Sequence, residues 1–252
     1  ASVVFSSAMA QYAQPLLPQV PMLVDFVDVD SAKWTQYAPA HRWPLSMVYR
    51  REGRRLLAYE RAVAAQARRS YFVTPNESAL FVSQAPESRD KVQSLSNGVD
   101  ADFFSPDPQR PNPFAAGEQA VVFTGAMDYW PNIDGVSWFV ADMLPRLRVH
   151  WPRARFYIVG RSPTPAVQAL AGEGVVVTGT VPDVRPYLQH AAAVVAPLRV
   201  ARGIQNKILE AMAMEQAVVT VPSCADAIGA TADQGLLRAV DTDGFLQAMQ
   251  QV

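Results

Sequence analysis

The chain has one cysteine, Cys224, and three histidines that lie far apart, His41, His150 and His190. A single thiol excludes an internal disulfide and any zinc site built from several thiolates, and the histidines lack metal-ligand spacing. A net charge of −1 gives no support for a nucleic-acid partner. We therefore expect neither a metal nor a nucleic-acid ligand.

Long apolar runs and export signals are also missing. No stretch of about 18 apolar residues exists, so we predict no membrane span. Residues 1–7 lack the charged start and long apolar core of a secretion signal and are typical of a strand whose start is missing. There is no initiator Met, and residues 250–252 fall inside a predicted helix that begins near Gly244. We expect a fragment that is truncated at both ends. We also expect a cytoplasmic protein, for which peripheral contact with the inner membrane is an alternative.

Half of the residues are hydrophobic and 18% are charged, which is typical of a globular protein. Four prolines between Ser105 and Pro113 indicate a linker. We therefore predict two domains, residues 1–107 and residues 108–252. In both, short apolar runs alternate with helical stretches, which predicts parallel sheets covered by helices.

The predicted strands and helices follow from apolar runs and amphipathic spacing. In the first domain the predicted strands are 21–29, 70–74 and 91–95, and the helix is 45–66. In the second domain the predicted strands are 120–124, 155–159, 175–178, 192–197 and 217–221, and the helices are 134–148, 165–171, 184–190 and 205–214.

The most informative segment follows the predicted strand 192–197. A basic turn with Gly203 leads into a helix that contains Lys207 and Glu210. A glycine turn lets backbone amides approach a ligand, and a helix start adds unpaired amides and partial positive charge. Lys207 and Glu210 share a helix face, where one can meet a phosphate and the other can accept sugar hydroxyls. The segment therefore predicts a site for a nucleotide or nucleotide-sugar.

Spacing alone leaves a second interpretation open, in which Lys207 and Glu210 form a solvated pair on the helix surface. Their place after a strand and a glycine turn favours a site. Glycines also follow three other strands, at Gly125, Gly160 and Gly179, and these turns would line one crevice at the carboxyl edge of a parallel sheet. For Gly160 we prefer the interpretation of a tight-turn glycine.

Two other features have competing interpretations. Asp28 and Asp30 would face the same side of an extended segment and could bind an acceptor hydroxyl, although for Asp30 we prefer capping of the next helix, by Asp30 or Ser31. Residues 42–69 contain eight arginines, and this segment includes the predicted amphipathic helix 45–66. This helix could rest on anionic lipid. We prefer a solvated face on which Glu52 and Glu60 are the partners.

Several motifs together resemble the group 1 (family 4) retaining glycosyltransferases of the GT-B fold, and most closely the sugar transferases of PEP-CTERM/exosortase exopolysaccharide systems. The motifs are Val24–Trp34, Asn97–Asp100, Phe104–Pro106, Phe123–Met127, Trp130–Asn132, Ile158–Gly160, Gly179–Val181, Arg202–Lys207 and Glu210–Ala213. They occur in order over nearly the whole chain.

The resemblance implies two Rossmann-like domains, with the acceptor-side domain incomplete and a donor domain that binds a nucleotide-diphosphate-sugar. It implies a hexosyl transfer to a glycan or lipid-linked acceptor, without a metal, by front-face attack. Lys207 and Glu210 are the implied catalytic residues, and Asp28 and Asp30 lie on the acceptor side. The implied donor-binding residues are Gly125, Ala126, Arg161, Val181, Arg202, Gly203, Ile204, Gln205 and Asn206.

The chain departs from this family at two points. Many members have an acidic residue eight positions before the one matched by Glu210, where this chain has Arg202. Many also have an arginine and a lysine after the first donor-domain strand, where residues 128–132 contain no cation. The missing charge would then come from Lys207, Arg202, Arg199 or Arg161, of which Arg161 is more typical of a surface cation.

Three functions other than glycosyl transfer are compatible with parts of the sequence to different degrees. A nucleotide-sugar epimerase has the same architecture but needs catalytic carboxylates and a histidine that we do not find. A nucleotide-sugar-binding module without activity fits a truncated chain. A dinucleotide-dependent oxidoreductase is disfavoured, because no Gly-x-Gly-x-x-Gly motif follows the first strand of either half.

Overall fold

The structure is a computed structural model that describes residues 1–17, 19–201 and 203–252. Its contacts divide the chain into two compact units. The first unit contains residues 1–97 and the short segment 202–204, and the second contains residues 98–201 and 205–252. The division after Asn97 falls before the predicted boundary at residue 107. Each unit has its own hydrophobic core.

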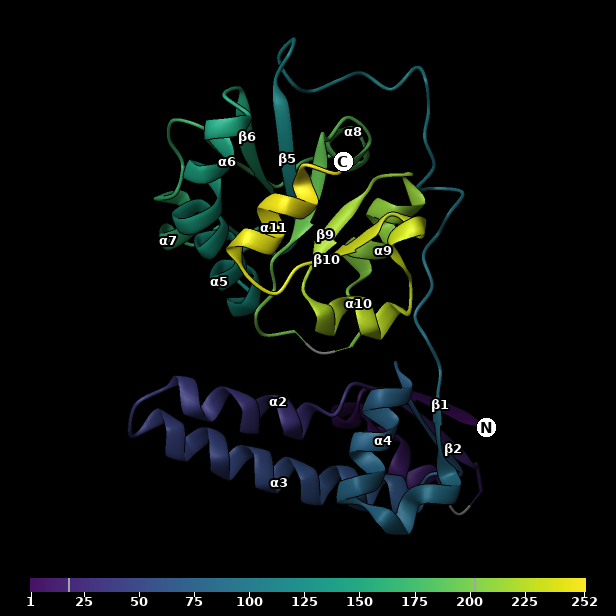
Figure 1. Cartoon of the computed structure of the whole chain (residues 1–252). Coiled ribbons are helices and arrows are strands. Elements are labelled where there is room, and N and C mark those ends of the chain that lie inside the picture. Colours follow the sequence, from purple (N-terminus) through teal and green to yellow (C-terminus); the bar gives the residue numbers. More distant parts are fainter. Residues whose placement is uncertain (18, 202) are drawn as a thin grey trace. The chain divides into compact units, whose positions relative to one another are not determined.

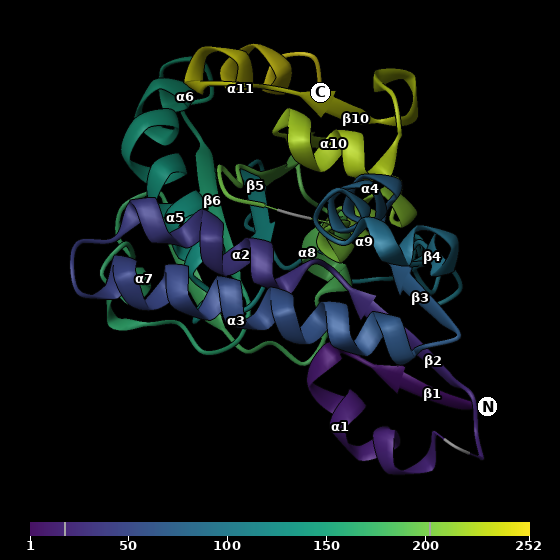
Figure 2. The same cartoon turned by 90° about the horizontal axis from the view of Figure 1, so that it is seen from below.

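The first unit is built on a four-stranded parallel sheet with the order β1-β2-β3-β4. The strands are β1 (Ser2–Phe5), β2 (Met22–Val27), β3 (Arg69–Phe72) and β4 (Val92–Ser94). The helices are α1 (Ala10–Ala13), α2 (Asp30–Tyr37), α3 (Leu45–Gln66) and α4 (Pro75–Gln84). Helices α2 and α3 lie side by side in both views (Figures 1 and 2). The predicted strands of this half are confirmed within a few residues, and α3 has the predicted bounds.

Aromatic rings fill the core of the first unit. Phe26 of β2 stacks on Phe72 of β3 with ring centroids 5.1 Å apart, and Phe81 of α4 packs against both. Helix α4, which we did not predict, begins at a local signal: the Thr74 side chain accepts a hydrogen bond from the Glu77 amide at 3.0 Å, and Pro75 opens the first turn.

The second unit contains a six-stranded sheet with the order β10-β9-β8-β5-β6-β7, in which every pairing is parallel. The strands are β5 (Gln119–Thr124), β6 (Ala154–Val159), β7 (Val175–Gly179), β8 (Ala193–Ala196), β9 (Val218–Thr220) and β10 (Leu236–Arg238). The five predicted strands are confirmed, and β10 was missed. The chain runs from β5 outward to β7 and then returns to β8 on the other side of β5. The boundary between β5 and β8 is therefore a topological switch point, where ligands of such sheets bind.

Helices surround this sheet (Figure 1). They are α5 (Trp130–Trp138), α6 (Leu144–His150), α7 (Pro165–Gln168), α8 (Arg185–Gln189), α9 (Asn206–Ala213), α10 (Pro222–Ile228) and α11 (Thr242–Met249). The predicted helix 134–148 is wrong at its start, because Trp130–Pro131 already forms the first turn of α5. A π-helical turn at Phe139–Met143 joins α5 to α6 just before Pro145, whose ring nitrogen has no hydrogen to donate.

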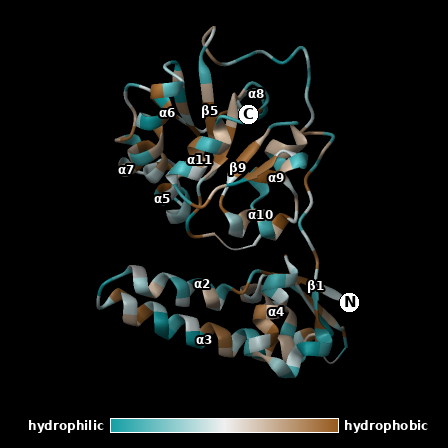
Figure 3. Cartoon of the chain, in the orientation of Figure 1, coloured by the Kyte–Doolittle hydropathy of each residue, from teal (hydrophilic) through white to brown (hydrophobic). Residues whose placement is uncertain are grey.

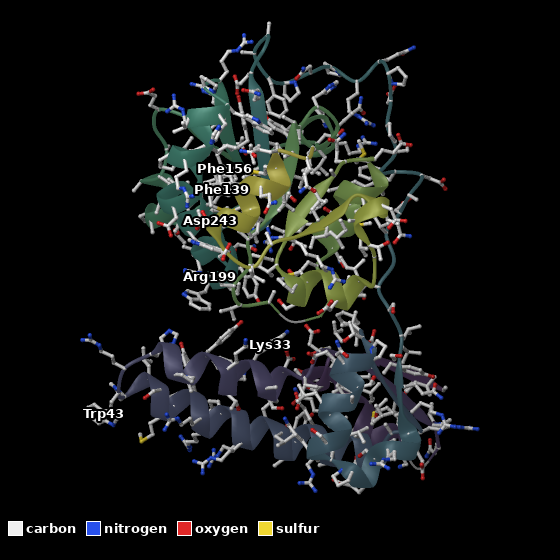
Figure 4. The ribbon with its side chains drawn as sticks, in the orientation of Figure 1. Lys33, Trp43, Phe139, Phe156, Arg199 and Asp243 are labelled. Carbon is white, nitrogen blue, oxygen red and sulfur yellow. The ribbon has the colours of Figure 1, made fainter. Side chains whose placement is uncertain are left out.

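The core of the second unit is also rich in aromatic rings. Phe139 and Phe156 pack with ring centroids 4.3 Å apart (Figure 4). Across the residues described in both units, no helix combines the length and the apolar character needed to cross a membrane.

Candidate active site

The switch point of the second unit brings together two helix starts. Lys207 lies in the first turn of α9 and Asn132 in the first turn of α5. The Lys207 Nζ donates a hydrogen bond to the Asn132 Oδ1 at 2.7 Å, and the Asn132 Nδ2 donates to the backbone oxygen of Ala126 at 2.8 Å. One buried amide therefore links the turn after β5 to the lysine on α9.

The surroundings of Lys207 are apolar for a charged group. Its Nζ lies 4.1 Å from the centroid of the Phe123 ring, and the side chain is half-buried. Burial lowers the pKa of Lys207 to about 7, although nearby Cys224 and Glu210 act in the opposite direction. The ammonium form therefore gains stability from any anion placed beside it, which would raise this pKa again.

Glu210 lies one turn further along α9. Burial raises the pKa of its carboxyl, and the Lys207 ammonium partly opposes this rise. The two side chains thus interact through their charges, in agreement with the shared helix face expected from their spacing. The arrangement places a cation and a hydrogen-bond acceptor at one end of one helix.

Two glycines shape the turns beside Lys207. Gly125 has φ 156° and Gly160 has φ 155°, which are conformations that favour glycine. A Cβ on Gly160 would lie 1.7 Å from the Gly125 oxygen, and a Cβ on Gly125 would lie 2.8 Å from the Lys207 Nζ. The Gly125 amide donates to Val159 and the Gly160 amide to Gly179. The turns after β5, β6 and β7 are therefore adjacent, and Gly160 is the tight-turn glycine that we preferred.

The other predicted cations differ in their availability. The guanidinium of Arg199, which is labelled in Figure 4, donates two hydrogen bonds to Asp134, the shorter at 2.5 Å. It lies 5.0 Å from the centroid of the Trp138 ring. The bond to Asp134 raises the pKa of Arg199, so this charge is already paired. Arg161 is exposed and its side chain has no ion pair or hydrogen bond with a described residue. Arg202 lies outside the described residues.

The remaining predicted donor residues surround the start of α9 or pack nearby. Gly203 has φ 64°, and Gln205 is the extended residue that precedes α9, so the helix begins at Asn206 rather than at the predicted residue 205. Half-buried Val181 packs against the core of the second unit. Whether these residues, or Ile204, bind a donor stays a prediction.

In the first unit, Asp28 and Asp30 converge on one lysine. The Lys33 Nζ lies 2.8 Å from an Asp28 oxygen and 3.1 Å from an Asp30 oxygen (Figure 4). Burial alone would lower the pKa of Lys33, but the two carboxylates outweigh it and hold that pKa above its usual range. The convergence does not come from strand alternation as predicted. Val27 has φ 68° and ends the strand, and Asp30 is already helical.

Three carboxylates hold the backbone around these aspartates. Asp25 accepts from the Val27 amide at 3.0 Å, Glu77 from the Val29 amide at 2.8 Å, and Glu60 from the Ser31 amide at 3.1 Å. The predicted capping of α2 by Asp30 or Ser31 is therefore wrong. Its cap position is Val29, and the free amides at the start of α2 are satisfied by Glu60 of α3.

Glu60 is fully buried and also accepts a hydrogen bond from the Ser31 hydroxyl at 2.5 Å. Burial raises the pKa of Glu60 to about 7, although the bonds from Ser31 oppose the shift. At pH values between 4.5, the usual pKa of a glutamate, and about 7, the folded state binds one proton more than the unfolded state. The free energy of unfolding therefore falls as the pH rises through this window.

We expect Glu60→Gln to remove this pH dependence. The change in the free energy of unfolding across the window is on the order of 3 kcal/mol. Amide hydrogen exchange in α2, measured below and above neutral pH, gives the change in stability of the first unit alone. Half-exposed Glu52 on the same helix gives the matched control, Glu52→Gln, which should keep the wild-type profile. Equal pH profiles for Glu60→Gln and wild type would contradict the assignment.

A hollow of about 310 Å³ lies at the opposite, amino-terminal edge of β5 and β6. Two of the three arginines that line it have acidic partners, Arg148 with Glu173 at 3.0 Å and Arg155 with Glu118 at 3.9 Å. This edge lies away from the carboxyl ends of the strands, where ligands of such sheets bind. Among the described residues, no group of three or more His, Cys, Asp or Glu side chains could hold a metal ion.

The parallel sheets and their strand order define an α/β protein of the GT-B type. Residues 118–252, more than half of the chain, match the family described as Glycosyl transferases group 1. The chain belongs to this glycosyltransferase family. A comparison with curated proteins gives no match.

Solved structures show the same fold. Sucrose-phosphate synthase from Thermosynechococcus elongatus has a TM-score of 0.74 at 18% identity, over 99% of this chain and 63% of that chain. HepE of Anabaena, in complex with UDP, has a TM-score of 0.70 at 12% identity, over 99% of this chain and 68% of that chain. WaaG, a glycosyltransferase involved in lipopolysaccharide biosynthesis, has a TM-score of 0.68 at 16% identity, over 97% of this chain and 71% of that chain. The chain thus spans roughly two thirds of the length of these structures.

Proposed function

We propose that the protein is a retaining glycosyltransferase that moves a sugar from a nucleoside-diphosphate donor to a glycan or lipid-linked acceptor. We further propose a cytoplasmic role in exopolysaccharide synthesis of the PEP-CTERM/exosortase type, on the strength of the sequence resemblance. The observation on which the proposal depends is the desolvated Lys207, which Asn132 holds beside the Gly125 turn at the switch point.

The donor diphosphate would lie beside the Lys207 ammonium and the amides of Gly203 and Ile204 that precede α9. The UDP in the HepE complex supports a nucleoside-diphosphate ligand for this fold. Arg161 is an exposed cation at the same sheet edge and is available to a phosphate. Glu210 would accept hydrogen bonds from hydroxyls of a ribose or hexose, because an ionised carboxylate is an acceptor only.

In the transfer step, the bond between the anomeric carbon and the diphosphate oxygen breaks, and a bond from the acceptor oxygen to that carbon forms on the same face. The acceptor's proton passes to the departing phosphate oxygen. Negative charge grows on the leaving diphosphate, and a preorganised Lys207 lowers the barrier by stabilising it. We name no protein nucleophile, and the step uses no metal.

Asp28 and Asp30 are proposed to bind acceptor hydroxyls. Their ion pairs with Lys33 and the three carboxylates that hold residues 27–31 would fix their positions. The strained φ of Val27, directly before Asp28, is of the kind found where a site dictates the backbone.

A thermal-shift screen with UDP-, GDP- and ADP-sugars tests the proposal, because a ligand at a hundredfold excess over its Kd stabilises the folded state by about 2.7 kcal/mol. We expect one nucleotide series to stabilise the chain. Product analysis with the full-length protein then separates transfer from epimerisation, which returns an isomeric donor, and from binding without turnover. Absence of a shift with all three series would contradict a donor site.

Donor affinity should depend on pH through Lys207. Its pKa of about 7 in the free protein means that the ammonium form dominates below neutral pH. Above neutral pH the neutral amine dominates, and it must take up a proton when the diphosphate binds. The diphosphate of an intact nucleotide-sugar does not titrate near neutrality. We therefore expect the Kd to be constant at acidic pH and to rise about tenfold per pH unit above pH 7. Calorimetry in buffers of different ionisation enthalpy measures this proton uptake, and a Kd independent of pH would contradict it.

A further inference from the structure

Helix α3 has an exposed basic surface whose arginines have no acidic partner among the residues that the structure describes. Arg50, Arg51, Arg54 and Arg55 have the spacing that places side chains on one side of a helix, and all four are exposed. None of the four forms an ion pair or a side-chain hydrogen bond with a described residue. We call these four arginines, together with the exposed apolar residues Trp43, Leu45, Met47 and Val48, the α3 basic surface.

Glu52 and Glu60, the acidic partners that we expected for the arginines of α3, do not pair with this surface. Glu60 is buried against Ser31 and cannot neutralise this surface. Glu52 has no ion pair with a described residue, and the arginine of α3 that is paired, Arg61, is bonded to Glu87 at 2.7 Å. The preferred interpretation, a solvated face with Glu52 and Glu60 as partners, is therefore wrong in its partners. Within the described part of the chain, no carboxylate pairs with the positive charge of Arg50, Arg51, Arg54 and Arg55.

Apolar side chains are exposed at the same end of the helix. Trp43 is 78% exposed, Met47 57%, Leu45 49% and Val48 41%. Trp43 lies at the tip of the α2–α3 hairpin (Figure 4). Figure 3 shows brown (hydrophobic) and teal (hydrophilic) segments following one another along α3. Exposed large apolar groups beside unpaired arginines indicate a surface that is covered by a partner with both properties.

We infer that this surface docks on an anionic phospholipid membrane. Arginines attract lipid phosphates, tryptophan is favoured at the headgroup level, and the apolar side chains reach the acyl boundary. Met47, Arg50 and Arg54, with Thr35 of α2, also line a hollow of about 500 Å³, which gives a phosphate headgroup a place between the two helices. The inference goes beyond the proposed transfer reaction and would bring the enzyme to a lipid-linked acceptor.

Vesicle co-sedimentation of the full chain, without any donor, tests this inference independently of the transferase proposal. We expect binding to vesicles of equal parts phosphatidylglycerol and phosphatidylcholine, weak binding to phosphatidylcholine alone, and release by salt as the charges are screened. Each arginine near such a surface is worth about fivefold in partitioning, so Arg50→Gln/Arg54→Gln should weaken binding about 25-fold.

The matched control is Arg68→Gln/Arg89→Gln, which removes two exposed arginines outside α3 and should bind like wild type. Trp43→Ser should weaken binding several-fold and, unlike the arginine changes, should do so at high salt as well. Circular dichroism and thermal unfolding establish that each variant is folded. Absence of binding to anionic vesicles, or equal weakening by the control pair, would overturn the inference. Preferred binding of RNA through Arg50 and Arg54, in competition with vesicles, would also overturn it.

Discussion

Replacing Lys207 by methionine should lower kcat for sugar transfer by about 10²–10³-fold, because loss of one preorganised donor to a developing anion costs about 2.7–4 kcal/mol. Methionine is close in length to the lysine stem and is apolar, so it fits the half-buried position beside Phe123 without leaving an unpaired charge. The folded state should not lose stability, because the burial that lowers the pKa of Lys207 penalises its charged form.

The measurement is the steady-state kcat for sugar transfer by the full-length protein and its Lys207→Met variant. Thermal unfolding of the same preparations gives their stability. Arg199→Gln is the matched control, since Arg199 is a cation of the same unit whose charge is paired with Asp134. It should change kcat by less than about threefold, as expected for a partly exposed ion pair. A Lys207→Met enzyme with activity close to that of wild type would remove the lysine from the mechanism.

Replacing Gly160 by alanine should destabilise the second unit by about 4 kcal/mol or more. The added Cβ would lie 1.7 Å from the Gly125 backbone oxygen, and neither backbone can move without breaking the bonds that join β5, β6 and β7. The φ of 155° adds strain for any residue with a Cβ. Effects of this size are exceptional for point mutations and have a specific structural cause.

Gly172→Ala is the control, because a Cβ at Gly172 meets no atom within 4 Å. Urea unfolding followed by tryptophan fluorescence should show a large shift of the midpoint for Gly160→Ala and little change for Gly172→Ala. A Gly160→Ala protein with a wild-type midpoint would mean that the three turns are not packed as described.

Much of the fold could be predicted from the sequence because the pattern is strong and local. The amphipathic stretch 45–66 is long and free of proline, so α3 has its predicted bounds. The strands that flank the switch point are uniform apolar runs, as expected for strands buried on both faces. Short elements with weak patterns were missed, such as β10, which has three residues, and α10, which begins at Pro222.

The candidate site was only partly predictable. Lys207, Glu210 and Gly125 follow from a turn and a helix spacing, which are local features. Asn132 was missed as a site residue because residues 128–132 were interpreted as a loop without a cation. Its amide acts through Lys207, which lies 75 positions away in the sequence. The Trp-Pro-Asn motif, with proline opening a helix, is the signal that could have located it.

The role of Glu60 could not be predicted for a related reason. A glutamate among arginines on an amphipathic helix is typical of a solvated face. Its burial depends on α2, whose first amides need an acceptor, and the partner, Ser31, is 29 positions away. Because Glu60 is buried in this way, it does not pair with the arginines of the α3 basic surface, and a helical pattern alone does not reveal this.

The most direct test of the proposed donor site is NMR of the protein with ¹³Cε-labelled lysine. Lys33, Lys91 and Lys207 are all the lysines in the sequence, so the signals can be assigned by substitution. Lys207 should titrate near pH 7 in the free protein, and addition of the nucleotide-sugar selected by the thermal-shift screen should raise that pKa. A Lys207 signal that titrates like an ordinary lysine, and is unchanged by the nucleotide-sugar, would contradict the site.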